Sequence, residues 1–181
     1  MDPLIAIEIA RLLAGGEPFV LATLVEARGS TPQKAGARML VRADGSTLGT
    51  LGGGCIEADA HAAAIDALST GGPRLLDFEL TEDIAVDYGL ACGGQERILI
   101  APMGHGGGLD RVVDALRNAA GRRGALVTLV RAADATAGHV AAVWSDGTID
   151  GYLGARHEEA VSAVAATLTI LNVLQAVASF L

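Results

Sequence analysis

Cysteine, lysine and aromatic residues are scarce in this sequence, and each shortage excludes a class of protein. Two cysteines in 181 residues are too few for a secreted disulfide framework, so we expect reduced thiols and a cytoplasmic protein. The single lysine and the net charge of −8 argue against a nucleic-acid-binding surface. With aromatic residues at only 3%, the core must be built mainly from Ala, Val, Leu and Ile.

Long apolar runs are also few, and neither end of the chain is typical of a membrane segment. Residues 1–20 lack a basic start followed by an apolar block, so they do not indicate a signal peptide. Residues 160–181 carry no charge and are long enough to span a bilayer, but Ser, Thr, Asn and Gln interrupt them. We expect a buried or subunit-interface helix there rather than a membrane span.

The apolar periodicity predicts an α/β protein with a mixed β-sheet and flanking helices. Asp44-Gly45 lies between two expected strands and predicts a tight hairpin turn. Helices are expected at 3–13, 56–68 and 109–120, and strands at 19–26, 37–42, 47–51, 73–80, 95–101 and 125–131.

The sequence also resembles itself at a displacement of about 102 residues, which predicts two degenerate strand–hairpin–helix repeats. We therefore expect a single domain over 1–181, with the functional site in the first half, 1–102, and a degenerate copy in the second, 103–181. Four matches carry the alignment: Asp44-Gly45 with Asp146-Gly147, Gly49 with Gly151, Leu51-Gly52 with Leu153-Gly154, and Glu57-Ala58 with Glu159-Ala160.

The second copy lacks the most distinctive residues of the first. It has no Gly-Ser-Thr-Pro stretch, and Ala155, Arg156 and His157 stand where the first copy has Gly53, Gly54 and Cys55. The scaffold can therefore be built without these glycines and the thiol. This favours a functional interpretation of Gly53, Gly54 and Cys55 over a purely structural one.

A thiol that follows glycines at the start of a helix suits several chemistries. The free N–H groups and partial positive charge of a helix start attract anions, and glycines let a ligand approach the backbone closely. The same field favours the thiolate. Cys55 is therefore a candidate for holding an anion, a soft metal or a transferable sulfur, and a tight turn with a small buried cysteine is the alternative.

Two further stretches offer similar chemistry. Cys92 precedes Gly93 and Gly94, but the two cysteines are 37 positions apart, which is not a zinc-finger spacing. The stretch from Gly29 to Pro32 carries Ser30 and Thr31, which either bind phosphate or cap the turn. Basic residues surround this stretch and form either an anion pocket or ordinary surface charge: Arg28, Lys34 and Arg38.

Three segments, ARGSTPQKAGARMLV, DGSTLGTLGGGCIEA and GLACGGQERILIAP, resemble the XdhC/CoxI family in their order and spacing. This family comprises accessory proteins of xanthine dehydrogenase and related molybdenum hydroxylases. The resemblance covers residues 19 to about 102. The C-terminal nucleotide-binding, Rossmann-like domain of many family members is not expected in this chain, which ends at Leu181.

The resemblance implies a chaperone more than a catalyst. Such proteins bind the molybdenum cofactor (molybdopterin) transiently, support its sulfuration and assist its insertion into the apo-enzyme. They are usually dimers and work with a cysteine desulfurase. The implied molybdenum contacts are Cys55 and Cys92. The implied cofactor-binding residues are Gly52, Gly53, Gly54, Cys55, Cys92, Gly93, Gly94, Ser30, Thr31 and Arg38.

Two other classes of function stay open from the sequence. One is a sulfur-transfer enzyme in which Cys55 carries a persulfide. The other is a structural or regulatory interaction module that uses the uncharged segment at 160–181.

Overall fold

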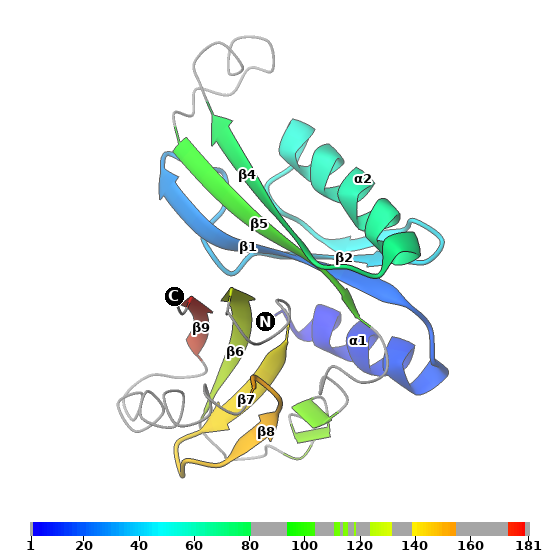
Figure 1. Ribbon diagram of the computed structural model, residues 1–181, viewed down its shortest axis with the longest axis vertical. Coiled ribbons are helices and arrows are strands. Elements are labelled where there is room, and N and C mark those ends of the chain that lie inside the picture. The colour runs from blue at the N-terminus through cyan, green and yellow to red at the C-terminus, as the bar shows by residue number, and fades with distance from the viewer. Residues whose placement is uncertain are drawn as a thin grey trace. The chain divides into compact units, whose positions relative to one another are not determined.

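The computed structural model describes residues 2–80, 94–103, 111–112, 114–115, 118, 124–131, 139–154 and 174–179. Over these residues the predicted α/β fold is confirmed, with helices and two β-sheets (Figure 1). The chain divides into two compact units, which are described separately. The first contains residues 1–5 and 17–103, and the second contains 6–16 and 104–181.

The first unit is a five-stranded antiparallel sheet in the order β3-β2-β1-β5-β4. Helix α1 (Pro3–Gly15) begins in this unit, and most of its residues belong to the second. The other elements are β1 (Phe19–Gly29), β2 (Arg38–Arg42), β3 (Thr47–Gly49), α2 (Gly54–Thr70), β4 (Arg74–Leu80) and β5 (Gly94–Met103).

Helix α2 lies across one face of this sheet (Figure 1). Its buried residues, Ile56, Ala60, Ala64 and Ala67, recur at helical spacing and form one core cluster with sheet residues that include Ile98. The alanines let the helix axis approach the sheet closely. Because side chains alternate along a strand, residues one position away from this cluster lie on the opposite face of the sheet.

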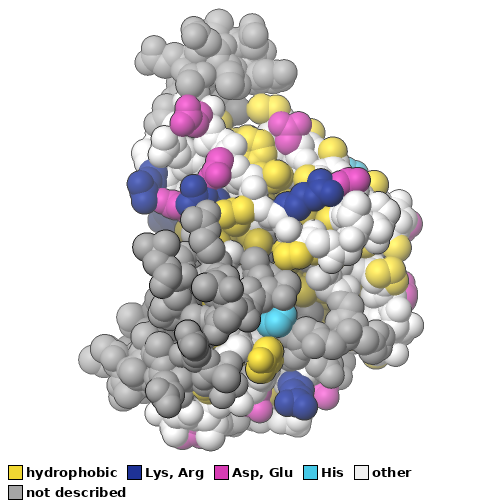
Figure 2. Space-filling view, in the orientation of Figure 1, with side chains coloured by type: hydrophobic (Ala, Val, Ile, Leu, Met, Phe, Trp, Pro, Cys, Tyr) yellow, Lys and Arg dark blue, Asp and Glu magenta, His cyan; other side chains and the backbone are white. Residues whose placement is uncertain are grey.

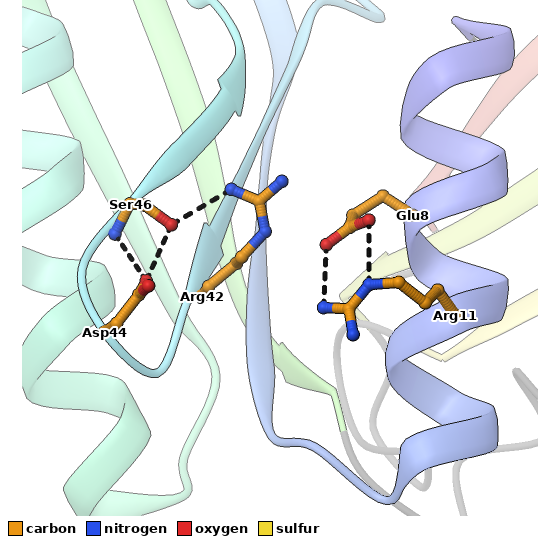
Figure 3. Close-up of polar contacts among 5 residues, drawn as sticks. All are labelled: Glu8, Arg11, Arg42, Asp44 and Ser46. Carbon is orange, nitrogen blue, oxygen red and sulfur yellow. Dashed lines mark hydrogen bonds and ion pairs between the residues drawn. The ribbon is translucent and has the colours of Figure 1, made fainter.

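The predicted turn at Asp44-Gly45 is confirmed between β2 and β3. Asp44 Oδ1 accepts hydrogen bonds from the Ser46 N–H at 2.9 Å and hydroxyl at 2.6 Å, and Arg42 Nη1 donates to Ser46 Oγ at 3.0 Å (Figure 3). Figure 3 also shows the ion pair between Arg11 and Glu8 on α1. The aspartate side chain fixes the turn, while Gly45 adopts the positive φ of 81° that the turn needs.

The second unit has a sheet in the order β8-β7-β6-β9, in which only the β6–β9 pair is parallel. Its strands are β6 (Gly124–Arg131), β7 (Val140–Trp144), β8 (Ile149–Gly151) and β9 (Leu174–Ser179). The predicted repeat is confirmed in its hairpin, because β7 and β8 stand 102 positions after β2 and β3. Met39 pairs with Gly49 in the first copy, and Ala141 pairs with Gly151 in the second.

The turn contacts repeat as well. Asp146 Oδ1 accepts from the Thr148 N–H at 2.9 Å and hydroxyl at 2.6 Å, as Asp44 does from Ser46. The bulge in β1 between Leu24 and Glu26 also has its counterpart in β6, between Leu129 and Arg131. The expected helix of the second copy, after Gly154, lies outside the described residues.

The expectation of a helix throughout 160–181 is wrong where it can be compared, because residues 174–179 form strand β9. An uncharged, alanine-rich segment has no strong period of its own, and pairing with the open edge of β6 satisfies its backbone groups. Residues 111, 112, 114 and 115 are helical, as expected for 109–120. No helix in the described part of the chain is long and apolar enough to cross a membrane.

Candidate functional site

The Gly-Ser-Thr-Pro stretch links the other two glycine motifs at one end of the five-stranded sheet. A Cβ atom added to Gly94 would lie 2.7 Å from the carbonyl oxygens of Arg28 and Ser30. A Cβ added to Gly52 would lie 2.8 Å from Pro32 Cβ. The loop after β1 therefore packs against both the start of β5 and the segment before α2, and only glycine fits at either contact. Gly52 and Gly94 thus have structural roles in addition to the predicted cofactor contacts.

Gly53 differs from these two glycines because open space surrounds it. A Cβ added there would meet no atom within 4 Å, yet Gly53 and Gly54 adopt positive φ angles of 82° and 70°. Helix α2 begins at Gly54, so the N–H groups of its first turn have no acceptor within the helix. This arrangement exposes backbone donors that an anionic group can approach.

Glu57 holds the loop in this conformation. Its Oε2 atom accepts hydrogen bonds from the Thr50 hydroxyl at 2.6 Å, the Leu51 N–H at 2.9 Å and the Gly53 N–H at 3.1 Å. Burial alone would raise the pKa of Glu57, but these three hydrogen bonds together lower that pKa below its ordinary value. Three of the loop's N–H groups are used internally, since the Gly52 N–H also donates to Thr50 Oγ1 at 3.0 Å. The sequence pointed to this residue only through its match with Glu159 in the second copy.

Cys55 is a free, half-buried cysteine that packs against the α2 core cluster. It lies on the same side of α2 as Asp66, about three turns further along, and Asp66 forms an ion pair with Arg74 at the start of β4. His61 lies on the other side of the helix, with Nε2 2.8 Å from the Gly45 carbonyl oxygen. Cys55 therefore faces the β4–β5 side of the sheet.

Cys55 also lies near the far end of β4. Eleven residue steps along the helix, from Cys55 to Asp66, span about 16 Å, and five steps along the strand, from Arg74 to Glu79, span about the same distance. Cys55 is thus roughly level with Phe78, and Phe78 pairs across the sheet with Glu96. Phe78 packs against the same core cluster as Cys55.

Glu96 is a functional candidate that no motif in the sequence indicated. It is only 2% exposed, and within the described part of the chain neither carboxylate oxygen has a hydrogen-bond partner. Burial raises the pKa of its carboxyl group. Its side chain lies on the α2 face because Glu96 is two positions from Ile98, a member of the α2 core cluster, and residues two apart on a strand share a face. The one indication in the sequence was that Glu96 is an acidic residue two positions before the apolar run of β5, which starts at Ile98.

The structure does not bring the predicted basic residues onto the face that carries Cys55. Arg38 is 4% exposed and pairs with Thr23, one position out of step with the α2 core cluster, so it lies on the opposite face. Burial lowers the pKa of Arg38 to about 10. It lines a cavity of about 270 Å³ together with Gln33 and Thr50. Arg28 pairs with Glu26 at 2.5 Å.

The other predicted polar contacts are simpler. Thr31 Oγ1 donates to the Gln33 carbonyl at 2.8 Å, which is the turn-capping alternative. Ser30 and Lys34 are exposed. Cys92 and Gly93 lie outside the described residues. Among the residues that are described, no group of three or more His, Cys, Asp or Glu side chains is arranged to hold a metal ion.

A second cavity, of about 390 Å³, lies where β1, β4 and β5 meet. Charged side chains line it in a cross-strand row, in which Arg97 bonds to Glu26 at 3.1 Å and to Asp77 at 2.5 Å. Basic and acidic side chains likewise lie next to each other in Figure 2. Because these charges pair with one another, this cavity lacks an unbalanced cation for an anionic ligand.

The described fold is an α/β domain in which an open glycine backbone and a thiol lie at the start of α2, with a buried carboxyl group on the same face of the sheet. Comparison with known proteins then points to one family. Residues 12–79 match the model of the XdhC and CoxI family, which confirms the predicted resemblance over that segment.

Curated relatives and a solved structure agree with this match. The molybdenum cofactor insertion chaperone PaoD of Escherichia coli is 39% identical over 82 residues, which are 45% of this chain and 26% of PaoD. A probable xanthine dehydrogenase component of Bacillus subtilis is 36% identical over 85 residues, 45% of this chain and 25% of that protein. The chain thus spans about a quarter of the length of these relatives.

The structural likeness extends further along the chain. A crystal structure described as a xanthine dehydrogenase from Bacillus halodurans has a TM-score of 0.63 and 28% sequence identity. The matched region covers 83% of this chain and 45% of that one. The fold of both units therefore has a counterpart in a longer protein.

Proposed function

We propose that this protein binds the molybdenum cofactor and assists its insertion into a xanthine dehydrogenase-type molybdenum enzyme. The observation that carries the proposal is Cys55, a free thiol beside the open backbone of Gly53, in the copy of the repeat that matches the family model. The second copy lacks both the thiol and the glycines. The names of PaoD and of the Bacillus subtilis relative support the same function.

The chemistry of the site fits the parts of this cofactor. A thiolate is a suitable ligand for a soft metal–dithiolene group, and exposed helix-start N–H groups suit a phosphate. Cys55 would hold the metal end, and the backbone at Gly53 and Gly54 would let the cofactor approach closely. The bound cofactor supplies the molybdenum centre on which the target hydroxylase depends. Glu57 keeps the loop in place, and Glu96 offers two buried oxygens that need donors.

The finer parts of the proposal follow from the family resemblance. We propose that binding is transient, that the protein supports sulfuration of the cofactor and that a cysteine desulfurase supplies the sulfur. Cys92, together with Gly93 and Gly94, is proposed as the second cofactor contact. We also propose a cytoplasmic homodimer that acts as a chaperone rather than as a catalyst.

Activation of a target enzyme tests this function. Protein loaded with molybdenum cofactor is mixed with the apo form of a xanthine dehydrogenase-type hydroxylase, and hydroxylase activity is followed. We expect wild-type protein to activate the enzyme faster than free cofactor does, and Cys55→Ala to give no acceleration. Equal activation by both proteins would overturn the assignment of Cys55.

A sulfur assay on the wild-type protein separates the chaperone from a sulfur-transfer enzyme. After incubation with a cysteine desulfurase, cyanide-labile sulfur on Cys55 in the absence of cofactor would indicate a persulfide carrier. We expect no stable persulfide without cofactor.

A further inference from the structure

Glu96 is energetically unfavourable as the structure has it. Neither oxygen of its carboxyl group has a hydrogen-bond partner in the described part of the chain, and the residue is 2% exposed. A buried polar group without partners costs about 1–3 kcal/mol, and more if it is charged. Apolar residues serve a core position at lower cost, so the carboxyl group needs an explanation other than packing.

The nearby cations do not supply the missing donors. Arg97 follows Glu96 directly, but its side chain lies on the opposite face of the sheet and bonds to Glu26 and Asp77. Arg28 bonds to Glu26 on that same face. On the α2 face, the cross-strand neighbours of Glu96 are Ala27 and Phe78, which have no donors in their side chains.

The position of Glu96 relates it to the proposed ligand site. It is two residues after Gly94, which packs against the Gly-Ser-Thr-Pro loop, and it pairs with Phe78, which packs against the same core cluster as Cys55. Glu96, Phe78 and Cys55 therefore lie at the same end and on the same face of the five-stranded sheet. This is also the end at which Gly53 leaves open space.

A carboxyl group with two unused oxygens best matches a ligand with two adjacent N–H donors in one plane. The Phe78 ring, a cross-strand neighbour of Glu96 on this face of the sheet, offers an apolar surface against which a flat ring can pack. A 2-amino-pyrimidin-4-one ring, the edge of a pterin, has such donors in its ring nitrogen and its exocyclic amino group.

We infer that Glu96 is a ligand-binding residue that accepts hydrogen bonds from the aminopyrimidinone edge of a pterin. The inference rests on the proposed function and divides the ligand between two residues, with the pterin edge at Glu96 and the metal end at Cys55. Because the carboxylate oxygens are enclosed, binding requires that the side chains covering them move. No covalent bond is made or broken in this step.

Binding of a free pterin tests the inference without metal or target enzyme. The probe is 6-hydroxymethylpterin, titrated by its fluorescence against wild type, Glu96→Gln, Glu96→Leu and the exposed-residue control Glu79→Gln. We expect saturable binding to wild type and to Glu79→Gln, binding at least tenfold weaker to Glu96→Gln, and none to Glu96→Leu. A pteridine-2,4-dione, which lacks the amino group, is expected to bind wild type at least tenfold more weakly than the pterin.

Equal pterin affinity in wild type and Glu96→Gln would overturn the inference, as would the absence of pterin binding to wild type. Circular dichroism of each variant checks the fold, and Glu96→Leu provides a second test if Glu96→Gln does not fold. The proposed function is tested by a different measurement, the activation of the hydroxylase and the loss of that activation in Cys55→Ala. We expect Cys55→Ala to keep its affinity for the free pterin, which separates the two ends of the site.

Discussion

Glu57 Oε2 accepts the N–H of Gly53 at 3.1 Å, so the first turn of α2 and the glycine loop before it are fixed by one carboxylate. The same oxygen accepts from Thr50 and Leu51. The loop is thus organised before any ligand arrives, which lowers the entropy that binding must overcome.

Replacing Glu57 with Gln should therefore loosen this loop. We expect a loss of about 1–3 kcal/mol in the free energy of unfolding at pH 7, because charge-assisted hydrogen bonds become neutral ones. The folded-state pKa of Glu57 lies below its unfolded value, so its stabilisation is present above that unfolded pKa and is lost as the pH falls through the folded pKa.

Urea unfolding at pH 7 and at pH 3 measures this difference. The Glu57→Gln deficit should be large at pH 7 and should shrink at pH 3. Asp59→Asn, at an exposed position on the same helix, is the control and should differ little from wild type. A deficit that is the same at both pH values would contradict the role given to the carboxylate.

Gly53 and Gly147 provide a matched pair for separating fold from function. Both have positive φ, 82° and 83°, and a Cβ at either would meet no atom within 4 Å. Alanine at each position should cost about 1–3 kcal/mol through backbone strain, with Gly53→Ala at the upper end because the ψ of Gly53, −172°, lies in a region that essentially only glycine populates. Only Gly53→Ala should also reduce the cofactor retained on purification, by several-fold, because its Cβ occupies the approach to the backbone. Equal retention by the two variants would rule out a special role for Gly53.

Two other glycines test the internal repeat. A Cβ at Gly49 would collide with the Arg38 carbonyl oxygen, and one at Gly151 would collide with that of Val140. Since neither strand can move without breaking its hairpin, each alanine variant should lose about 3 kcal/mol or more. Thermal unfolding followed by circular dichroism checks this, and two variants with wild-type midpoints would contradict the structural equivalence.

Glu96 should show a pH dependence opposite to that of Glu57. Its folded-state pKa is raised above the unfolded value, so the protein is destabilised as the pH rises from the unfolded pKa through the folded pKa. We expect Glu96→Gln to unfold at a higher urea concentration than wild type at pH 8, with the difference shrinking towards pH 4. A Glu96→Gln protein that is less stable than wild type at pH 8 would show that the carboxylate has a donor.

Local sequence patterns predicted most of the first unit. Asp44-Gly45 specified its turn, and the match between the two hairpins followed from the same residues in each copy, because turn chemistry acts over a few positions. The segment at 174–179 was predicted wrongly as helix. Its strand conformation depends on pairing with β6, about fifty residues earlier. The residues of 174–179 alone do not indicate that pairing.

The candidate site was predicted in part. The link between the glycine motifs follows from close contacts of Gly52 with Pro32 and of Gly94 with Ser30, which spacing alone could not reveal. The sequence grouped Arg38 with the site, but strand alternation places it on the opposite face. Glu96 was not predicted, because what marks it is that its buried carboxylate oxygens have no hydrogen-bond donors among the described residues. Only the folded structure shows which donors surround a side chain.

The molybdenum and pterin content of the purified protein tests the central claim most directly. Wild type and Cys55→Ala are expressed in cells that make the cofactor, with Gly147→Ala as a control variant in the second unit, and both contents are measured per chain. We predict that wild type and Gly147→Ala retain molybdenum and that Cys55→Ala loses most of it. Equal molybdenum in wild type and Cys55→Ala would contradict the assignment of Cys55 as the residue that holds the cofactor.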